Sequence, residues 1–142
     1  MITIELAGTP IGKGRPRFIR STGHAYTPEK TRNYETNLRL AAQDAMGGAE
    51  PLSGPLRVTV EARFPVPASW SRKKREAALA ASFVSRERLY PACRPDADNI
   101  CKTVGDALNE IVFHDDKQII DLRVIKAYSA RPALRIEVVE IA

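Results

Sequence analysis

The sequence predicts an α+β domain in which a small mixed or antiparallel sheet of about four strands is packed by two main helices. Alternating apolar residues near both ends of the chain are typical of half-buried strands. Between them, apolar residues recur at helical spacing. The chain has 142 residues, of which 44% are hydrophobic and 27% are charged. This length and composition fit one globular domain over residues 1–142.

The main strands are expected where apolar and polar residues alternate. The first covers residues 2–7 and the second covers residues 56–64. One face of the second strand carries the apolar side chains of Leu56, Val58, Val60 and Ala62. The last two strands, residues 118–128 and 133–141, are predicted to form an antiparallel pair joined near residues 129–132.

The two main helices are expected at residues 28–46 and 98–109. In the first, Thr27 is predicted as the N-cap and Pro28 as the first helical residue, and glycine at position 47 ends the helix. The residues predicted to face the core are Tyr34, Leu38, Ala41, Ala42 and Ala45.

The charge of the chain indicates an anionic partner. The formal net charge is +5 and the sequence pI is about 9.5, and nucleic acid is the commonest partner of such basic domains. Lysines and arginines crowd residues 13–20 and 72–75, the latter within a short helix expected over residues 72–81. Aspartates crowd residues 96–98 and 115–116 instead.

Nothing in the sequence indicates a membrane protein. No apolar run approaches the ~20 residues that span a bilayer, and the N-terminal residues do not form a signal peptide. We therefore expect no membrane partner and a cytoplasmic location. The two cysteines, Cys93 and Cys101, match no common zinc spacing and are expected to be reduced thiols.

The acidic segments point to metal-assisted chemistry on a phosphodiester. Mg²⁺ prefers oxygen ligands, and three converging carboxylates from Asp96, Asp98 and Asp116 would hold it. Such an ion acidifies a bound water and neutralises charge at the attacked phosphate, and Lys102 is placed to steady that phosphate or the water. Each residue alone also has a structural interpretation: Asp98 as a helix N-cap, Asp96 and Asp116 as turn residues, and Lys102 as a helical ion-pair partner.

Chain geometry limits how these carboxylates can meet. A helix over residues 98–109 is about 18 Å long at ~1.5 Å per residue. Asp116 lies seven residues past Asn109, and seven extended residues span at most ~23 Å. Asp116 therefore reaches the start of the helix only if the helix stops near Asn109 and residues 110–116 run back nearly straight. Residues 111–113 are expected to be the extended segment of this return. A longer helix would require a site shared across a dimer, or no site at all.

Several motifs in this chain resemble those of the RusA family of Holliday-junction resolvases. They are Arg-Pro-Asp-Ala-Asp-Asn-Ile-Cys-Lys at residues 94–102, Asp-Ala-Leu-Asn at 106–109 and Asp-Asp-Lys-Gln-Ile at 115–119. The resemblance extends to Gly-Lys-Gly-Arg-Pro-Arg-Phe at 12–18, Tyr-Thr-Pro at 26–28 and Ser-Trp-Ser at 69–71. It therefore covers most of the chain.

The resemblance implies a homodimeric crossover junction endodeoxyribonuclease that nicks four-way junctions symmetrically in DNA recombination and repair. It implies Mg²⁺ as the cofactor, or Mn²⁺ in its place. The family's catalytic aspartates match Asp96, Asp98 and Asp116, and its important lysine matches Lys102. It also implies a prophage origin and the cytoplasm of a bacterial or phage-infected cell. Related chains often have glycine at the position of Glu110, so the turn here is expected to need Asn109 in a left-handed conformation.

The basic segments are expected to bind DNA by its phosphates, which fixes position without reading sequence. The candidate residues are Lys13, Arg15, Arg17, Arg72, Lys73, Lys74, Arg75 and Arg94. For residues 72–75, a solvated charge run is an equally good interpretation. A further feature is a face of small residues, Cys101, Gly105 and Asn109, which is expected to meet the chain's own sheet, a partner helix or DNA.

Two rival functions fit the same residues. One is a module that binds branched DNA without cutting it, although carboxylates beside DNA would repel it in the absence of a cation. The other is a nuclease of broader specificity that cuts flaps, replication forks or ordinary duplex. Only a comparison of junction, flap and linear substrates separates this second rival from a junction resolvase.

Overall fold

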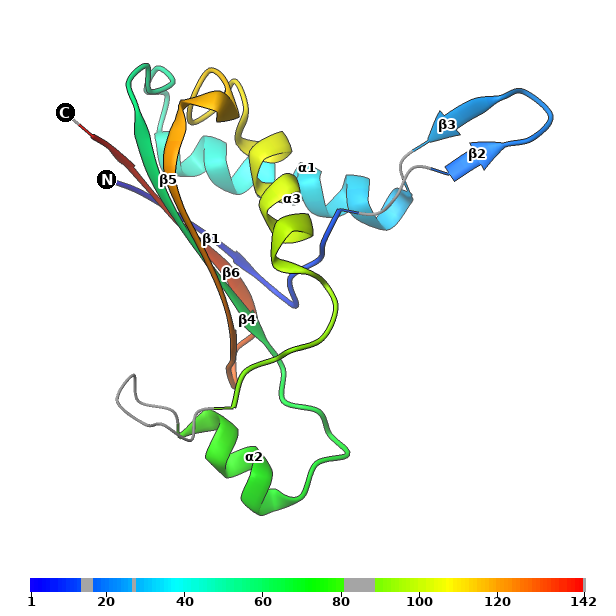
Figure 1. Cartoon of the computed structure of the whole chain (residues 1–142). Coiled ribbons are helices and arrows are strands. Elements are labelled where there is room, and N and C mark those ends of the chain that lie inside the picture. Colours follow the sequence, from blue (N-terminus) through cyan, green and yellow to red (C-terminus); the bar gives the residue numbers. More distant parts are fainter. Residues whose placement is uncertain (14–16, 27, 81–88, 142) are drawn as a thin grey trace.

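The computed structural model describes residues 1–13, 17–26, 28–80 and 89–141 (Figure 1). These residues form an α+β fold, as predicted. In chain order the elements are β1 (Ile2–Ala7), β2 (Arg17–Ile19), β3 (His24–Tyr26), α1 (Glu29–Met46), β4 (Leu56–Phe64), α2 (Arg72–Leu79), α3 (Ala97–Leu108), a 3-10 turn η1 (Asp116–Gln118), β5 (Ile119–Tyr128) and β6 (Ala133–Glu140). Among the described elements, no helix is both long and apolar enough to cross a membrane.

The main sheet is mixed and has the strand order β1-β6-β4-β5. The predicted pairing of the last two strands is wrong, because β4 lies between β5 and β6, parallel to β5 and antiparallel to β6. Residues 129–132 cross the end of β4, where the Ser129 N–H donates to the Phe64 carbonyl at 2.9 Å. Two strand spacings are only about 10 Å, so a four-residue connection spans them easily.

Helices α1 and α3 cover the same face of this sheet, whereas α2 stands apart from them near the end of β4 (Figure 1). One apolar core joins α1, α3 and the sheet. The face of β4 predicted to be buried is buried, with Leu56, Val58, Val60 and Ala62 all at 0% exposure. The β2–β3 hairpin extends away from the sheet beyond the first turn of α1 (Figure 1).

Helix α1 departs from its prediction at both ends. It begins at Glu29 with Pro28 as N-cap, one position later than predicted, and the predicted cap Thr27 lies outside the described residues. At the other end, Gly47 adopts φ 56° and stops the helix as expected. Met46 is buried in place of the predicted Ala45, which is exposed, because Met46 continues the i+4 spacing of Leu38 and Ala42.

Helix α3 ends where the sequence predicts, with Leu108 as its last residue and Asn109 as its C-cap. The left-handed residue, however, is Glu110 at φ 67°, whereas Asn109 has φ −55°. Residues 110–112 form a turn, so the predicted extended segment at 111–113 is wrong. The turn closes through a Glu110 N–H bond to the Phe113 carbonyl at 2.7 Å.

Candidate active site along helix α3

The start of α3 presents two carboxylates to solvent. Asp96 is the N-cap residue but its side chain makes no capping hydrogen bond, and Asp98 lies in the first turn. Both residues are exposed. Asp98 is therefore not the N-cap that its structural interpretation required, and neither carboxylate is consumed in holding the helix end.

Asp116 opens the 3-10 turn η1, which is held by a residue that the sequence prediction missed. The Gln118 side-chain oxygen accepts from the N–H groups of His114 and Asp115 at 2.9 and 3.0 Å. Its amide nitrogen donates to the carbonyls of Leu52 and Gly54 at 2.9 and 3.0 Å. These bonds anchor the turn to the segment before β4. The pattern Asp115-x-x-Gln118 is a capping box, so the sequence held a signal for the cap of η1, although not for the bonds to Leu52 and Gly54.

The Asp116 carboxylate rests against α3 at Gly105. A Cβ placed on Gly105 would lie 3.1 Å from Asp116 Oδ2, which is tighter than ordinary van der Waals contact. Glycine therefore permits the close approach of the turn to the helix. The small-residue face thus meets the chain's own turn at this point, rather than the sheet itself.

The electrostatics of α3 link Asp116 with Asp98. The pKa of the Cys101 thiol is raised by burial first, and then by the negative charges of Asp116 and Asp98. Cys101 therefore lies within the field of both carboxylates, although 18 residues separate them along the chain. Burial and the neighbouring carboxylates Asp115 and Asp106 also raise the pKa of Asp116.

The grouping is looser than a preformed metal cage. Within the described part of the chain, no three His, Cys, Asp or Glu side chains stand close enough together to hold an ion. Asp116 meets the helix at Gly105, two turns beyond Asp98, instead of at its N-terminal end. Lys102 lies four residues after Asp98, on the neighbouring turn, and is exposed. The described residues offer it no salt-bridge partner.

Lys13 is the first of the predicted DNA-binding residues, and its charge is already matched. Its ammonium lies 2.6 Å from a carboxylate oxygen of Glu35 in α1 and 2.9 Å from one of Asp106 in α3. Arg15 lies outside the described residues. Arg17 begins β2, but its side chain is outside the described part of the structure.

The basic residues of α2 divide into two groups. Arg72 pairs with Glu76 at 3.0 Å, and Lys74 lies 4.0 Å from the centre of the Trp70 ring. That ring packs edge-on against Tyr128, so Trp70 serves as a packing anchor. Lys73 and Arg75 are exposed and have no salt bridge to any described residue.

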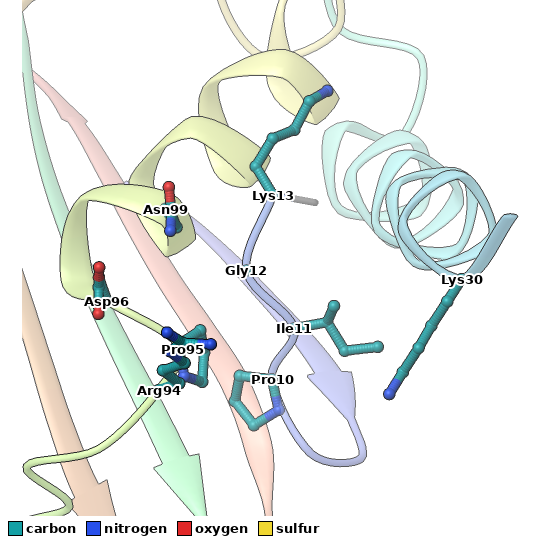
Figure 2. Close-up of a pocket in the computed structure, with 9 residues that line it drawn as sticks. All are labelled: Pro10, Ile11, Gly12, Lys13, Lys30, Arg94, Pro95, Asp96 and Asn99. Atoms are coloured by element: carbon teal, nitrogen blue, oxygen red, sulfur yellow. The ribbon is translucent and has the colours of Figure 1, made fainter. Parts of the chain in front are cut away.

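A hollow of about 630 Å³ opens beside Asp96 (Figure 2). Residues 10–13 line it, together with Lys30 of α1 and the segment 94–96 and Asn99 at the start of α3. We call it the basic hollow. Arg94, a predicted DNA-binding residue, lies on its wall and is exposed. Lys30 was missed by the sequence prediction because it stands alone, outside any cluster of basic residues.

Carboxylates at the start of α3 and exposed basic side chains beside them suit metal-assisted chemistry on nucleic-acid phosphates. Residues 7–139 match the family model "Endodeoxyribonuclease RusA", and the chain belongs to this family. It is therefore an enzyme of the endodeoxyribonuclease class. It is also 32% identical to "Uncharacterized protein YqaN" of Bacillus subtilis (strain 168), over 99% of this chain and 97% of that protein.

Proposed function

We propose that this endodeoxyribonuclease resolves Holliday junctions by paired symmetric nicks, as a homodimer that depends on a divalent metal ion. Its substrate is then branched DNA formed in recombination and repair, in the cytoplasm of a bacterial or phage-infected cell, and a prophage origin is part of the same proposal. The observation that carries the proposal is the approach of Asp116 to the helix face that bears Asp98. Two segments far apart in sequence thus place carboxylates on the same side of α3.

The three side chains offer oxygen donors of the kind that a hard divalent cation prefers, although the described structure does not bring them within reach of one ion. Asp96 and Asp98 are exposed at the start of α3 and make no capping bond, and Asp116 faces the same helix. Carboxylate oxygens are the ligands that Mg²⁺ and Mn²⁺ prefer. We infer that Asp96, Asp98 and Asp116 hold the ion. When bound, it supplies a more acidic water and positive charge at the attacked phosphate.

The other residues act on the DNA itself. Lys102, one helical turn from Asp98, is proposed to donate to the phosphate oxygens, which gain negative charge as the phosphodiester is attacked. Lys73, Arg75 and Arg94 are exposed cations suited to the DNA backbone. Contacts of this kind give affinity without reading bases, which suits an enzyme that selects substrates by branch geometry.

Cleavage of a synthetic immobile four-way junction tests the catalytic assignment. The wild-type chain is expected to nick it in Mg²⁺ and not without added metal. Asp98→Asn and Asp116→Asn are each expected to slow cleavage at least a hundredfold while junction binding persists, because each removes a metal-holding charge. Asp44→Asn, a change at an exposed carboxylate on α1, is the matched control and is expected to cut normally.

The same assay separates the two rivals. Persistence of cleavage near the wild-type rate in Asp98→Asn would overturn the catalytic assignment. Binding of junctions by the wild-type chain without any cutting would favour the binding module. Equal cutting of junctions, flaps and linear duplex would favour a broader nuclease.

A further inference from the structure

One wall of the basic hollow, residues 10–13, is packed tightly against the start of α3. A Cβ on Gly12 would lie 2.7 Å from Pro95 Cβ and 3.1 Å from Asn99 Cβ. The next residue, Lys13, donates its backbone N–H to the Asn99 carbonyl at 3.1 Å. Residues 10–13 are therefore fixed against the segment that carries Asp96.

Lys13 completes this anchor and is not available to an anion. Its ammonium joins Glu35 and Asp106 and so ties residues 10–13 to both main helices. Partial burial alone would lower the pKa of Lys13, but the two carboxylates outweigh burial and raise it. In Figure 2 its side chain extends along α3, in the opposite direction from Lys30.

Lys30 and Arg94 differ from Lys13 in this respect. Both are exposed and both line the hollow, and neither forms a salt bridge within the described part of the chain. They come from different elements, the first turn of α1 and the segment before α3. Two unmatched cations facing one hollow favour an anion there. Pro10, Ile11 and Pro95 add apolar surface to the same wall.

We propose that the basic hollow seats one backbone phosphate of the DNA strand to be cut, next to the phosphate attacked beside Asp96. Lys30 and Arg94 bind this neighbouring phosphate together, and the apolar wall packs against its sugar. Lys13 is a positioning residue that holds the wall in place. The inference rests on the proposed function, because a DNA strand at Asp96 brings a second phosphate into the hollow.

A protein–DNA double-mutant cycle tests the shared phosphate. Single methylphosphonates, which carry no charge, are placed along the junction strands around the cut, and binding is measured without cleavage in the Asp98→Asn chain. One position is expected to weaken binding about tenfold. Lys30→Gln and Arg94→Gln are each expected to reduce that loss at the same position, because one cation remains, and the double variant is expected to abolish it. Arg32→Gln, an exposed neighbour on α1 that does not line the hollow, is expected to retain it.

The salt dependence of binding gives a second readout. Each single variant is expected to lower the slope of log affinity against log salt by no more than about one. The double variant is expected to lower it by about one in total, because only one phosphate is involved. A slope change near two, or loss of sensitivity at two different methylphosphonate positions, would overturn the shared phosphate. Unchanged binding in both single variants would also overturn it.

These measurements are independent of the proposed resolvase activity. Binding is measured without cutting, so a chain that fails to resolve junctions can still show one phosphate shared by Lys30 and Arg94. Conversely, normal resolution by Lys30→Gln and Arg94→Gln, with additive effects at every methylphosphonate, would leave the resolvase function intact and remove the phosphate seat.

Discussion

Gly105 lies inside α3, where glycine costs about 1 kcal/mol relative to alanine. The cost has a local reason, because the absence of a Cβ lets the Asp116 carboxylate approach the helix. Helix stability and the placement of a proposed metal ligand therefore make opposite demands on this position. A substitution that favours the helix is expected to harm the site.

Gly105→Ala is accordingly expected to keep the free energy of unfolding within about 1 kcal/mol of the wild-type value. Its junction cleavage rate is expected to fall about tenfold, because the new Cβ pushes the Asp116 carboxylate by a few tenths of an ångström. Denaturant unfolding and single-turnover cleavage measure the two effects on one sample. Undiminished cleavage by this variant would contradict the proposed role of Asp116.

Glu110 carries the left-handed conformation at the start of the turn after α3. A left-handed backbone costs an L-residue about 1–2 kcal/mol, whereas glycine adopts it freely. The left-handed conformation was predicted at Asn109, because asparagine tolerates it better than glutamate does. The structure instead puts it one residue later, at the position where the resemblance to RusA chains leads one to expect glycine.

Glu110→Gly is expected to raise the free energy of unfolding by about 1 kcal/mol. Glu110→Ala serves as the control, since it removes the same side chain but keeps a Cβ and the strain, and its stability is expected to match the wild type. Urea unfolding monitored by circular dichroism decides between them. A destabilised glycine variant would show that the conformation at residue 110 carries no strain.

At the scale of elements, the sequence predicted the bounds that depend on neighbouring residues alone. The bounds of β4 follow from its alternating apolar residues, and the end of α3 follows from the end of the helical apolar pattern at Leu108. Both were predicted correctly. The turn at residues 110–118 was not, because its shape depends on bonds from Gln118 to Leu52 and Gly54. Those partners lie more than 60 residues away in sequence, beyond the reach of any local pattern.

The η1 turn is expected to depend on Gln118. Gln118→Ala leaves its four hydrogen-bond partners unmatched and is expected to cost about 1–2 kcal/mol of unfolding free energy. Cleavage is expected to fall as well, since the turn carries Asp116, while junction affinity stays near the wild-type value. Gln118→Glu keeps the acceptor oxygen but sets a second carboxylate oxygen against the carbonyls of Leu52 and Gly54, so a loss at least as large is expected. Full cleavage activity in the alanine variant would contradict this positioning role.

At the scale of the molecule, the strand order was the feature that sequence reasoning could not supply. The pattern of residues 118–141 predicts two strands of opposite direction, and their directions are indeed opposite. Whether they pair depends on a third strand, β4, which inserts between them. This insertion pairs β4 on both edges and leaves β5, which follows the η1 turn that begins at Asp116, at one edge of the sheet.

The two-fold symmetry of the proposed substrate favours a dimeric enzyme. Each chain carries one proposed set of catalytic carboxylates, Asp96, Asp98 and Asp116, whereas resolution of a four-way junction needs two nicks in strands related by a two-fold axis. Two chains related by the same axis would provide one site for each nick. Inactivating one subunit of the proposed dimer should therefore abolish one of the two nicks and leave the other.

Mixed dimers of the wild type and Asp98→Asn, purified through two different affinity tags, are expected to nick a junction once. Denaturing gels should then show a cut strand, while native gels show no separated duplex products, because the second strand remains intact. A mixed dimer of wild type with Asp44→Asn is the control and should resolve the junction fully, since residue 44 is an exposed position on α1. Full resolution by the Asp98→Asn mixed dimer would mean that one site makes both nicks, and sedimentation of the active species as a monomer would exclude the two-fold arrangement altogether.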